Sequence, residues 1–515
     1  MSAKDHWIKT GSDGELDGTT PEEINKLVGR LASEEKIVIH LHGGLVSESR
    51  ATAKAKELIP EYRSVDSYPV FFIYRTGVFE IIRNNLREIA NEKIFKKLAK
   101  KLLKYAIGKL TTVGGAKAVG GLDMPRDLAV AIEYKKLEKN VEPYSDVAAI
   151  EGLKQLTDEE EKLFMDDLAT DVDFQTEIQA IVDGATDDQE KVKTGAKGIT
   201  LSHRVSSKTL MSPEVVQDLV EDASMKDGKG IFSTARAILK AGAILRRVVY
   251  RYWKKRDHGL HPTIVEELLR EFYLANIGAA VWNTMKKETS DTFESAPGGE
   301  VRGGRYFVDK LGETLKDTGH TPEVTVVAHS LGSVFACNLI QDLAASRKDP
   351  NHPLPSTFQL KNLILLAPAV ECEVFADTLR ENRKLFEKFR MYSLDDEHES
   401  NYWEVPAVYS RSLLYLVSGA FEETDDEKSA FDRPLVGMQR YITEDDVYKM
   451  ADVKKVRKFF AEDNDYTVWA VVDKGDGLAS DAVRHGGFDD AVFKPGQQER
   501  RATLDSILHV IQHGM

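Results

Sequence analysis

Cysteine is scarce in this chain, which contains only Cys337 and Cys372 among 515 residues. Two cysteines cannot form a disulfide framework and these two lack the spacing of a zinc site, so we expect a reducing compartment, the cytoplasm. Long apolar runs are also missing, since no stretch approaches the roughly 18 uncharged apolar residues of a membrane span. The polar N-terminus lacks the apolar segment of a signal peptide. We therefore expect neither secretion nor insertion into a membrane.

An excess of basic residues is absent as well. The chain has 70 Lys and Arg against 84 Asp and Glu, a net charge of -14, so no nucleic-acid partner is expected. Hydrophobic residues make up 42% and charged residues 30%, which is typical of folded globular proteins. A chain of this length exceeds the size at which one core stops growing, so we expect one domain with a large insertion, or two domains.

Short apolar runs rich in β-branched and aromatic residues predict buried strands. Their apolarity is continuous rather than alternating, as expected where helices cover both faces of a mostly parallel sheet. Segments with helical spacing separate most of these runs, which predicts an α/β fold. The predicted strands are 36–41, 68–74, 323–328, 362–366, 389–394 and 467–472, and the predicted helices of the same domain are 49–62, 305–316, 333–345 and 501–512.

A long segment without a convincing strand interrupts this alternation. We predict that residues 1–84 and 301–515 form the sheet domain and that residues 85–300 form an all-helical insertion. Charge is segregated within the insertion. Residues 93–110 hold seven lysines and no acid, with their apolar side chains on one helical face, whereas residues 158–190 are strongly acidic.

Two interpretations of residues 93–110 remain open. An amphipathic helix with a lysine-rich face can lie on an anionic membrane, to which each basic residue near the surface contributes about 1 kcal/mol. This predicts peripheral contact with the inner membrane face. Alternatively, the apolar stripe packs within the insertion and the lysines pair with residues 158–190.

Ser330 lies in the sequence Ala-His-Ser-Leu-Gly, residues 328–332, where a predicted strand meets a predicted helix. A serine on such a tight turn has an exposed hydroxyl, and the turn tolerates only small residues two positions before and after it, here Ala328 and Gly332. This pattern resembles the nucleophile elbow of the α/β-hydrolase family, usually Gly-x-Ser-x-Gly, with the alanine that some lipase-like members share. A serine that merely caps the helix is the ordinary alternative, and we expect His329 to pack beside the turn.

The resemblance includes a second turn. The first predicted strand runs into His42-Gly43-Gly44-Leu45, which looks like the His-Gly-Gly turn that supplies half of this family's oxyanion hole. The resemblance implies that the backbone N–H of Gly44, with Leu45 as the neighbouring alternative, and that of Leu331 bind the oxyanion.

The family also places an acid after a later strand and a histidine after the last one. Asp395 and Asp396 follow the predicted strand 389–394, and His485 lies in a loop after 467–472. The resemblance implies that Ser330 attacks an acyl carbon, that His485 moves the proton, and that an aspartate, Asp396 in preference to Asp395, fixes the imidazole tautomer. An ordinary loop histidine and aspartates that cap a turn are the alternatives.

The resemblance thus implies a serine hydrolase, similar to a lipase or carboxylesterase, that cleaves a small-molecule or lipid acyl ester through an acyl-serine intermediate. It implies no cofactor and no metal, and it implies that residues 85–300 form a cap or lid over Ser330. Phospholipid is a candidate substrate because of the basic segment. Two other functions stay open: an acyltransferase with the same triad, and a non-catalytic protein that binds membrane surfaces or partners.

A metal-dependent hydrolase is a further alternative. His40 and His42 are two residues apart in a predicted strand, so their side chains point to the same side and could share a metal. The glycines that follow, Gly43 and Gly44, favour the oxyanion turn instead.

Overall fold

The chain divides into two compact units in a computed structural model. The sheet unit comprises Met1–Phe79, Val281–Glu399 and Pro434–Met515, and the helical unit comprises Glu80–Ala280 and Ser400–Arg433. The structure describes residues 3–44, 46–74, 79–112, 125–146, 153–193, 209–224, 233–273, 279–294, 301–349, 354–355, 358–422, 432–491 and 501–515.

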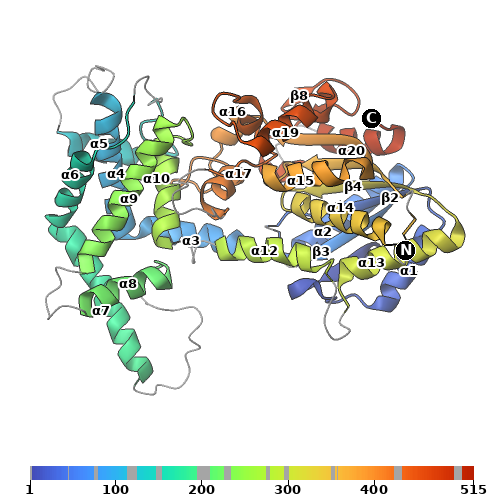
Figure 1. Cartoon of the computed structure of the whole chain (residues 1–515), viewed down its shortest axis with the longest axis horizontal. Coiled ribbons are helices and arrows are strands. Elements are labelled where there is room, and N and C mark those ends of the chain that lie inside the picture. The colour runs from blue at the N-terminus through green and yellow to red at the C-terminus, as the bar shows by residue number, and fades with distance from the viewer. Residues whose placement is uncertain are drawn as a thin grey trace. The chain divides into compact units, whose positions relative to one another are not determined.

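The sheet unit is built on a seven-stranded sheet in the order β1-β3-β2-β4-β5-β6-β7 (Figure 1). Every pair of neighbouring strands is parallel. The strands are β1 (Trp7–Thr10), β2 (Lys36–Leu41), β3 (Ser67–Tyr74), β4 (Glu323–His329), β5 (Leu360–Leu366), β6 (Phe386–Leu394) and β7 (Thr467–Ala470). A separate antiparallel pair, β8 (Val472–Asp473) and β9 (Ala479–Ser480), follows β7.

Helices pack on both faces of this sheet. Phe71 and Phe72 are neighbours in β3 and therefore point to opposite faces. Phe71 belongs to the core that includes Leu58 and Ile507, whereas Phe72 contacts Phe307 and Phe335. The helices of the unit include α1 (Pro21–Leu31), α2 (Glu48–Ser64), α12 (Ala279–Asp291, whose first two residues belong to the helical unit), α13 (Gly303–Thr318), α14 (Gly332–Lys348), α15 (Cys372–Asn382), α16 (Asp396–Ser400), α18 (Gln439–Thr443), α19 (Ala451–Phe460) and α20 (Ala502–His513).

Local signals explain where several of these elements begin. At the start of α1, the Thr20 hydroxyl accepts from the N–H of Glu23 while the Glu23 carboxylate accepts from the N–H of Thr20, which is a capping box. At the start of α2, the Ser47 hydroxyl accepts from the N–H of Arg50, which is a simple side-chain cap. Both helices then bury an apolar face against the rest of the unit.

The described residues of the helical unit form helices and no sheet. They include α3 (Phe79–Asn91), α4 (Lys93–Thr112), α5 (Arg126–Lys135), α6 (Asp158–Ala169), α7 (Val172–Lys193), α8 (Pro213–Ser224), α9 (Ser233–Trp253), α10 (Leu260–Leu268) and α17 (Leu413–Leu416). Two single π-helical turns, Leu269–Tyr273 and Val417–Phe421, follow α10 and α17. The predicted fold class, a mostly parallel sheet flanked by helices with a large helical insertion, is confirmed.

The helical unit differs from the predicted insertion, residues 85–300, in its boundaries. Most of α12, from Val281 on, belongs to the sheet unit, and the segment Ser400–Arg433 joins the helical unit from the other end of the chain. A buried ionic network gives the physical reason for this second difference. Asp432 of that segment lies 3.4 Å from the Nε2 of His258, and the hydroxyl of Tyr409 donates to Glu266 of α10 at 2.5 Å.

The centre of this network is Arg251 of α9, whose side chain is fully buried. Its guanidinium lies 2.7 Å from Glu266 and 3.1 Å from Glu267, and His258 lies 2.8 Å from Glu266. Burial alone raises the pKa of Glu266, but His258 and Arg251 outweigh burial and lower the pKa to about 2. Because an unpaired buried charge is costly, these contacts hold α9, α10 and the 400–433 segment together.

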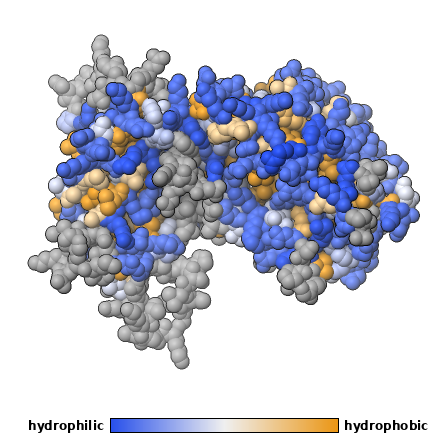
Figure 2. All heavy atoms as spheres, in the orientation of Figure 1, coloured by the Kyte–Doolittle hydropathy of each residue, from blue (hydrophilic) through white to orange (hydrophobic). Residues whose placement is uncertain are grey.

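The surface in view is mainly hydrophilic on both units, with apolar patches between hydrophilic residues (Figure 2). Among the helices formed by the described residues, none combines the length and the apolar character that crossing a membrane requires.

Candidate functional site

Ser330 lies on a strained turn between β4 and α14. Its φ is 54°, in the left-handed region that residues other than glycine rarely adopt, and its side chain is buried. The end of β5 holds this conformation, because the N–H of Ser330 donates to the carbonyl of Leu366 at 2.9 Å. The N–H of Ala369 in turn donates to the carbonyl of Ser330 at 3.2 Å. The turn is therefore fixed by its neighbours in the sheet.

Gly332, two residues after the serine, has no room for a side chain. A Cβ at this position would lie 2.4 Å from the carbonyl oxygen of Leu41 at the end of β2. The small residue that the elbow pattern requires is thus needed here because α14 begins in direct contact with the backbone of β2.

His485 faces the serine. Its Nε2 lies 2.9 Å from the Oγ of Ser330, and it begins the short 3-10 helix His485–Gly487 in the loop that follows β9. Burial lowers the pKa of His485 to about 3, helped by the nearby His329 and opposed by Asp489. The imidazole is therefore neutral near pH 7, which is the state that can accept a proton from a hydroxyl. Its Nδ1 is buried and has no hydrogen-bond partner among the described residues.

The two predicted acids do not reach this Nδ1. Asp395 directly follows β6, but its Oδ1 accepts a hydrogen bond from the N–H of His398 and lies 2.8 Å from the Nδ1 of the same residue. It thereby caps the start of α16. Asp396 is the first residue of α16, and its N–H donates to the side chain of Gln439 at 3.0 Å. The structure brings together Ser330 and His485 and pairs neither aspartate with the imidazole.

A different carboxylate, Asp489, lies buried beside the site. Its Oδ2 is 3.6 Å from the Nε2 of His40 and 3.6 Å from the Nδ1 of His329, and its Oδ1 is 3.5 Å from the Nζ of Lys54. Burial alone raises the pKa of Asp489, but Lys54 and His329 hold it well below its usual range. Asp489 is not among the acids predicted from the sequence. No local pattern in the sequence sets it apart from the neighbouring acids Asp481 and Asp490.

The predicted oxyanion turn packs directly on the elbow. A Cβ on Gly43 would lie 3.3 Å from the Cβ of Ser330, and one on Gly44 would lie 2.4 Å from the side chain of Leu331. Leu331 is the N-cap residue of α14, so its amide is among those that the helix itself leaves without an acceptor. Glycines here let the backbone of the turn approach the serine closely. Leu45, the alternative donor, lies outside the described residues.

Two histidines precede this turn, and protein groups face each of their nitrogens. The Nδ1 of His40 is 2.9 Å from the hydroxyl of Tyr62, and its Nε2 faces Asp489. His42 donates from Nδ1 to the carbonyl of Gly43 at 2.8 Å and accepts at Nε2 from the N–H of Tyr74 at 3.3 Å. Burial lowers the pKa of His42 to about 4. Among the residues that the structure describes, no group of three or more His, Cys, Asp or Glu could hold a metal ion.

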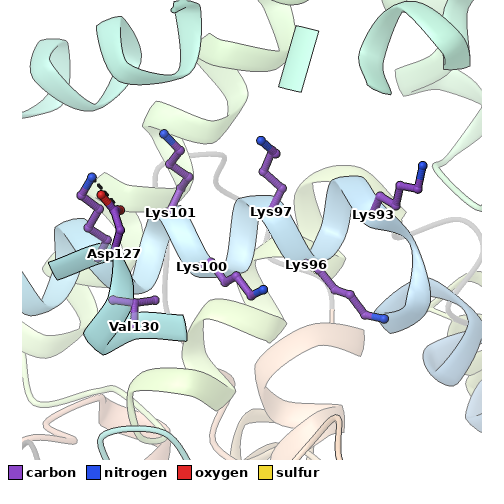
Figure 3. A pocket seen from close by; sticks show the side chains of 8 residues that line it. Lys93, Lys96, Lys97, Lys100, Lys101, Asp127 and Val130 are labelled. Carbon is purple, nitrogen blue, oxygen red and sulfur yellow. Dashed lines mark ion pairs between the residues drawn. The ribbon is translucent and has the colours of Figure 1, made fainter. Parts of the chain in front are cut away.

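A pocket of about 390 Å³ lies along α4 in the helical unit (Figure 3). Lysines of α4 project to both sides of the helix, and several have acidic partners. This is the arrangement that the packing interpretation of residues 93–110 expects. The pocket is lined by Lys93, Lys96, Lys97, Lys100, Lys101, Lys104, Asp127 and Val130, and the ion pairs include Lys97–Asp171 at 2.6 Å, Lys101–Asp167 at 2.9 Å, Lys104–Asp127 at 2.8 Å and Lys109–Glu160 at 2.7 Å.

Comparison with known proteins gives one match. A family model described as "Alpha/beta hydrolase of unknown function (DUF900)" matches residues 304–398. This range includes most of α13, the Ser330 elbow and the strands β4, β5 and β6. No curated protein and no solved structure matches the chain. Together with the parallel sheet, this match supports an α/β-hydrolase fold for the sheet unit.

Proposed function

We propose that this chain is a serine hydrolase, similar to a lipase or carboxylesterase, that cleaves an acyl ester through an acyl-serine intermediate. The observation that carries the proposal is the 2.9 Å contact between the Oγ of Ser330 and the Nε2 of His485. A serine hydroxyl on a strained strand-to-helix turn, bonded to a neutral imidazole, has the geometry of an activated nucleophile. The helix-cap alternative for Ser330 gains no support, because α14 has no side-chain cap.

The reaction follows from these positions. The Oγ of Ser330 attacks the acyl carbon while the Nε2 of His485 takes the hydroxyl proton. The oxyanion that forms is bound by the N–H groups of Gly44 and Leu331, and each such donor is worth about 2.7 to 4 kcal/mol in a serine hydrolase. His485 then gives its proton to the leaving alcohol, and a water molecule activated by the same imidazole releases the acid.

The aspartate of the predicted triad has less support than Ser330 and His485. Asp395 occupies the position after β6 where the family resemblance places the acid, yet its carboxylate caps α16 and faces His398. The carboxylate of Asp396 does not bond to His485 either, because the imidazole Nδ1 has no hydrogen-bond partner in the described part of the chain. We therefore propose a mechanism that needs only Ser330 and His485 for proton transfer.

The proposed substrate is a class of compounds and not a single molecule. A small-molecule or lipid acyl ester fits a nucleophile of this kind, and the role of residues 85–300 as a cap stays a prediction. Peripheral membrane contact through residues 93–110, and with it a phospholipid substrate, also stays a prediction, although ion pairs already engage several of these lysines.

Hydrolysis of short and medium acyl p-nitrophenyl esters tests the proposal. Ser330→Ala should abolish turnover, because no other hydroxyl in the described site contacts His485. Ser346→Ala is a matched control, since Ser346 is also buried on α14 but about four helical turns away. Full activity of Ser330→Ala would overturn the proposal. Product analysis with added acceptor alcohols distinguishes hydrolysis from acyl transfer.

A further inference from the structure

His329, which directly precedes Ser330, has an acceptor in front of each ring nitrogen. Its Nε2 donates to the main-chain carbonyl of His485 at 2.9 Å, and its Nδ1 lies 3.6 Å from the Oδ2 of Asp489. A neutral imidazole carries one N–H, whereas the imidazolium carries two. A carbonyl oxygen and a carboxylate both attract an N–H and repel a lone pair. Both contacts are therefore favourable together only when His329 is protonated.

The charges around His329 support that state. Asp489, with a side chain only 6% exposed, is the carboxylate that faces the ring, and Lys54 is the nearby cation. His40 and His42 lie on β2 or directly after it, and burial lowers the pKa of each. Burial also lowers the pKa of His329 by itself, but Asp489 and the carbonyl of His485 outweigh it and raise the pKa above its ordinary value.

The contact with the carbonyl of His485 bears on the orientation of that residue. With no partner at Nδ1 among the described residues, the imidazole of His485 is not aligned by an acid in the usual way. Its main-chain carbonyl, in contrast, accepts a hydrogen bond from His329, the residue that precedes the nucleophile. This hydrogen bond fixes the main-chain position from which the imidazole of His485 reaches Ser330.

We propose that His329, held by Asp489, is the positioning residue that keeps His485 facing Ser330. It acts as an imidazolium whose Nε2 donates to the carbonyl of His485 while its Nδ1 forms an ion pair with the carboxylate of Asp489. This inference rests on the proposed function and assigns to a residue pair the orienting role that the sequence had given to Asp395 or Asp396. Asp489 has a second effect. The ring centroids of His329 and His485 are 5.5 Å apart, so a positive charge on His329 disfavours the imidazolium that forms on His485 during catalysis. The carboxylate of Asp489 offsets this repulsion.

Kinetics across pH test this role. For the wild type, we expect kcat to fall at alkaline pH as His329 loses its second proton, with a midpoint above the ordinary value of about 6.5. Asp489→Asn should lower kcat by about 100-fold at neutral pH with little change in KM, and it should move the alkaline midpoint to lower pH. His329→Gln should lower kcat and remove the alkaline midpoint. Asp490→Asn, a change in the adjacent and more exposed acid, is the matched control and should lower kcat less than threefold, because its ion pairs with Lys54 and Arg484 are partly exposed to solvent.

A titration of the histidine ring protons by nuclear magnetic resonance gives a readout that needs no activity. We expect a resonance with a pKa above 6.5 in the wild type that is missing in His329→Gln and shifted to lower pH in Asp489→Asn. An unchanged alkaline midpoint in Asp489→Asn, or a His329 resonance that titrates at or below 6.5, would overturn the inference. So would a larger loss of kcat in Asp395→Asn than in Asp489→Asn. Inactive wild-type protein would overturn the proposed function, while the resonance would still decide the inference.

Discussion

The Nε2 of His485 lies 2.9 Å from the Oγ of Ser330, although 155 residues separate the two in the sequence. Ser330 follows β4, and His485 lies beyond β7, β8 and β9. The carboxyl ends of parallel strands meet at one edge of a sheet, and this is where open α/β sheets place their sites. The same edge carries Gly43 and Gly44 after β2. The site is thus a consequence of the strand order.

Gly332 should not tolerate even a methyl group. Its Cβ would meet the carbonyl oxygen of Leu41 at 2.4 Å, so Gly332→Ala should destabilise the protein by about 1 to 3 kcal/mol and lower esterase activity. Gly29→Ala in α1 is the matched control, because nothing lies within 4 Å of the added methyl group. It should stabilise by about 0.5 to 1 kcal/mol. Urea unfolding measures both changes, and equal effects of the two substitutions would contradict the crowding at the elbow.

Acid should destabilise the fold through its buried neutral histidines. Burial, with Arg411 adding to it, lowers the pKa of His261 to about 3. The folded state therefore binds fewer protons than the unfolded state below about pH 6.5, so this contribution is present above pH 6.5 and is lost as the pH falls toward 3. His261→Leu should reduce the loss of stability by up to about 1.4 kcal/mol per pH unit between roughly pH 6 and 4.

The free energy of unfolding in urea, measured at several pH values, checks this prediction. His513→Gln, a change in an exposed residue at the end of α20, should leave the pH dependence as it is in the wild type. Parallel curves for wild type and His261→Leu would show that His261 does not titrate as its burial requires.

The buried network of the helical unit should be sensitive to the loss of one charge. Glu266→Gln leaves Arg251 and His258 with one anionic partner fewer in a fully buried place, so we expect a loss of about 3 to 5 kcal/mol. Glu313→Gln removes an exposed pair with Lys310 and should cost about 1 kcal/mol or less. Hydrogen exchange of α9 and α10 should report the difference. Similar protection in the two variants would argue against the network as the support of this unit.

Ion pairs should weaken any attraction of α4 for membranes. Asp167 and Asp171 face Lys97 and Lys101, so the double variant Asp167→Asn, Asp171→Asn should expose positive charge and bind anionic vesicles more tightly than the wild type at low salt. Asp183→Asn on α7 is the control, because Asp183 bonds to Gln179. Vesicle sedimentation measures the binding. Tight wild-type binding that the double variant does not change would show that these acids do not mask the lysines.

Continuous apolar runs predicted much of the sheet, because a strand covered on both faces leaves a local pattern. β2 was predicted at its observed bounds, 36–41, and β4 within one residue. β1 was missed because its four residues, Trp7–Thr10, are too few to show a pattern. The Ser330 elbow was predictable since its constraint is also local: small residues must flank the serine.

The rest depended on contacts between distant segments. Asp395 follows β6 as the family resemblance requires, but its short distance to His398 decides what its carboxylate does. Asp489 is one of many acids in the sequence, and only the fold shows that it is buried against His329 and Lys54. Likewise, the association of residues 400–433 with the helical unit depends on the burial of Asp432, which no local pattern indicates.

The most direct measurement of the central claim is the rate at which a fluorophosphonate modifies the intact protein, with the modified residue identified by mass spectrometry. We expect modification at Ser330, and we expect His485→Asn to slow it by at least about 100-fold, because the hydroxyl loses the base that removes its proton. Modification at another residue, or the same rate in His485→Asn as in the wild type, would contradict the claim that Ser330 and His485 act together as nucleophile and base.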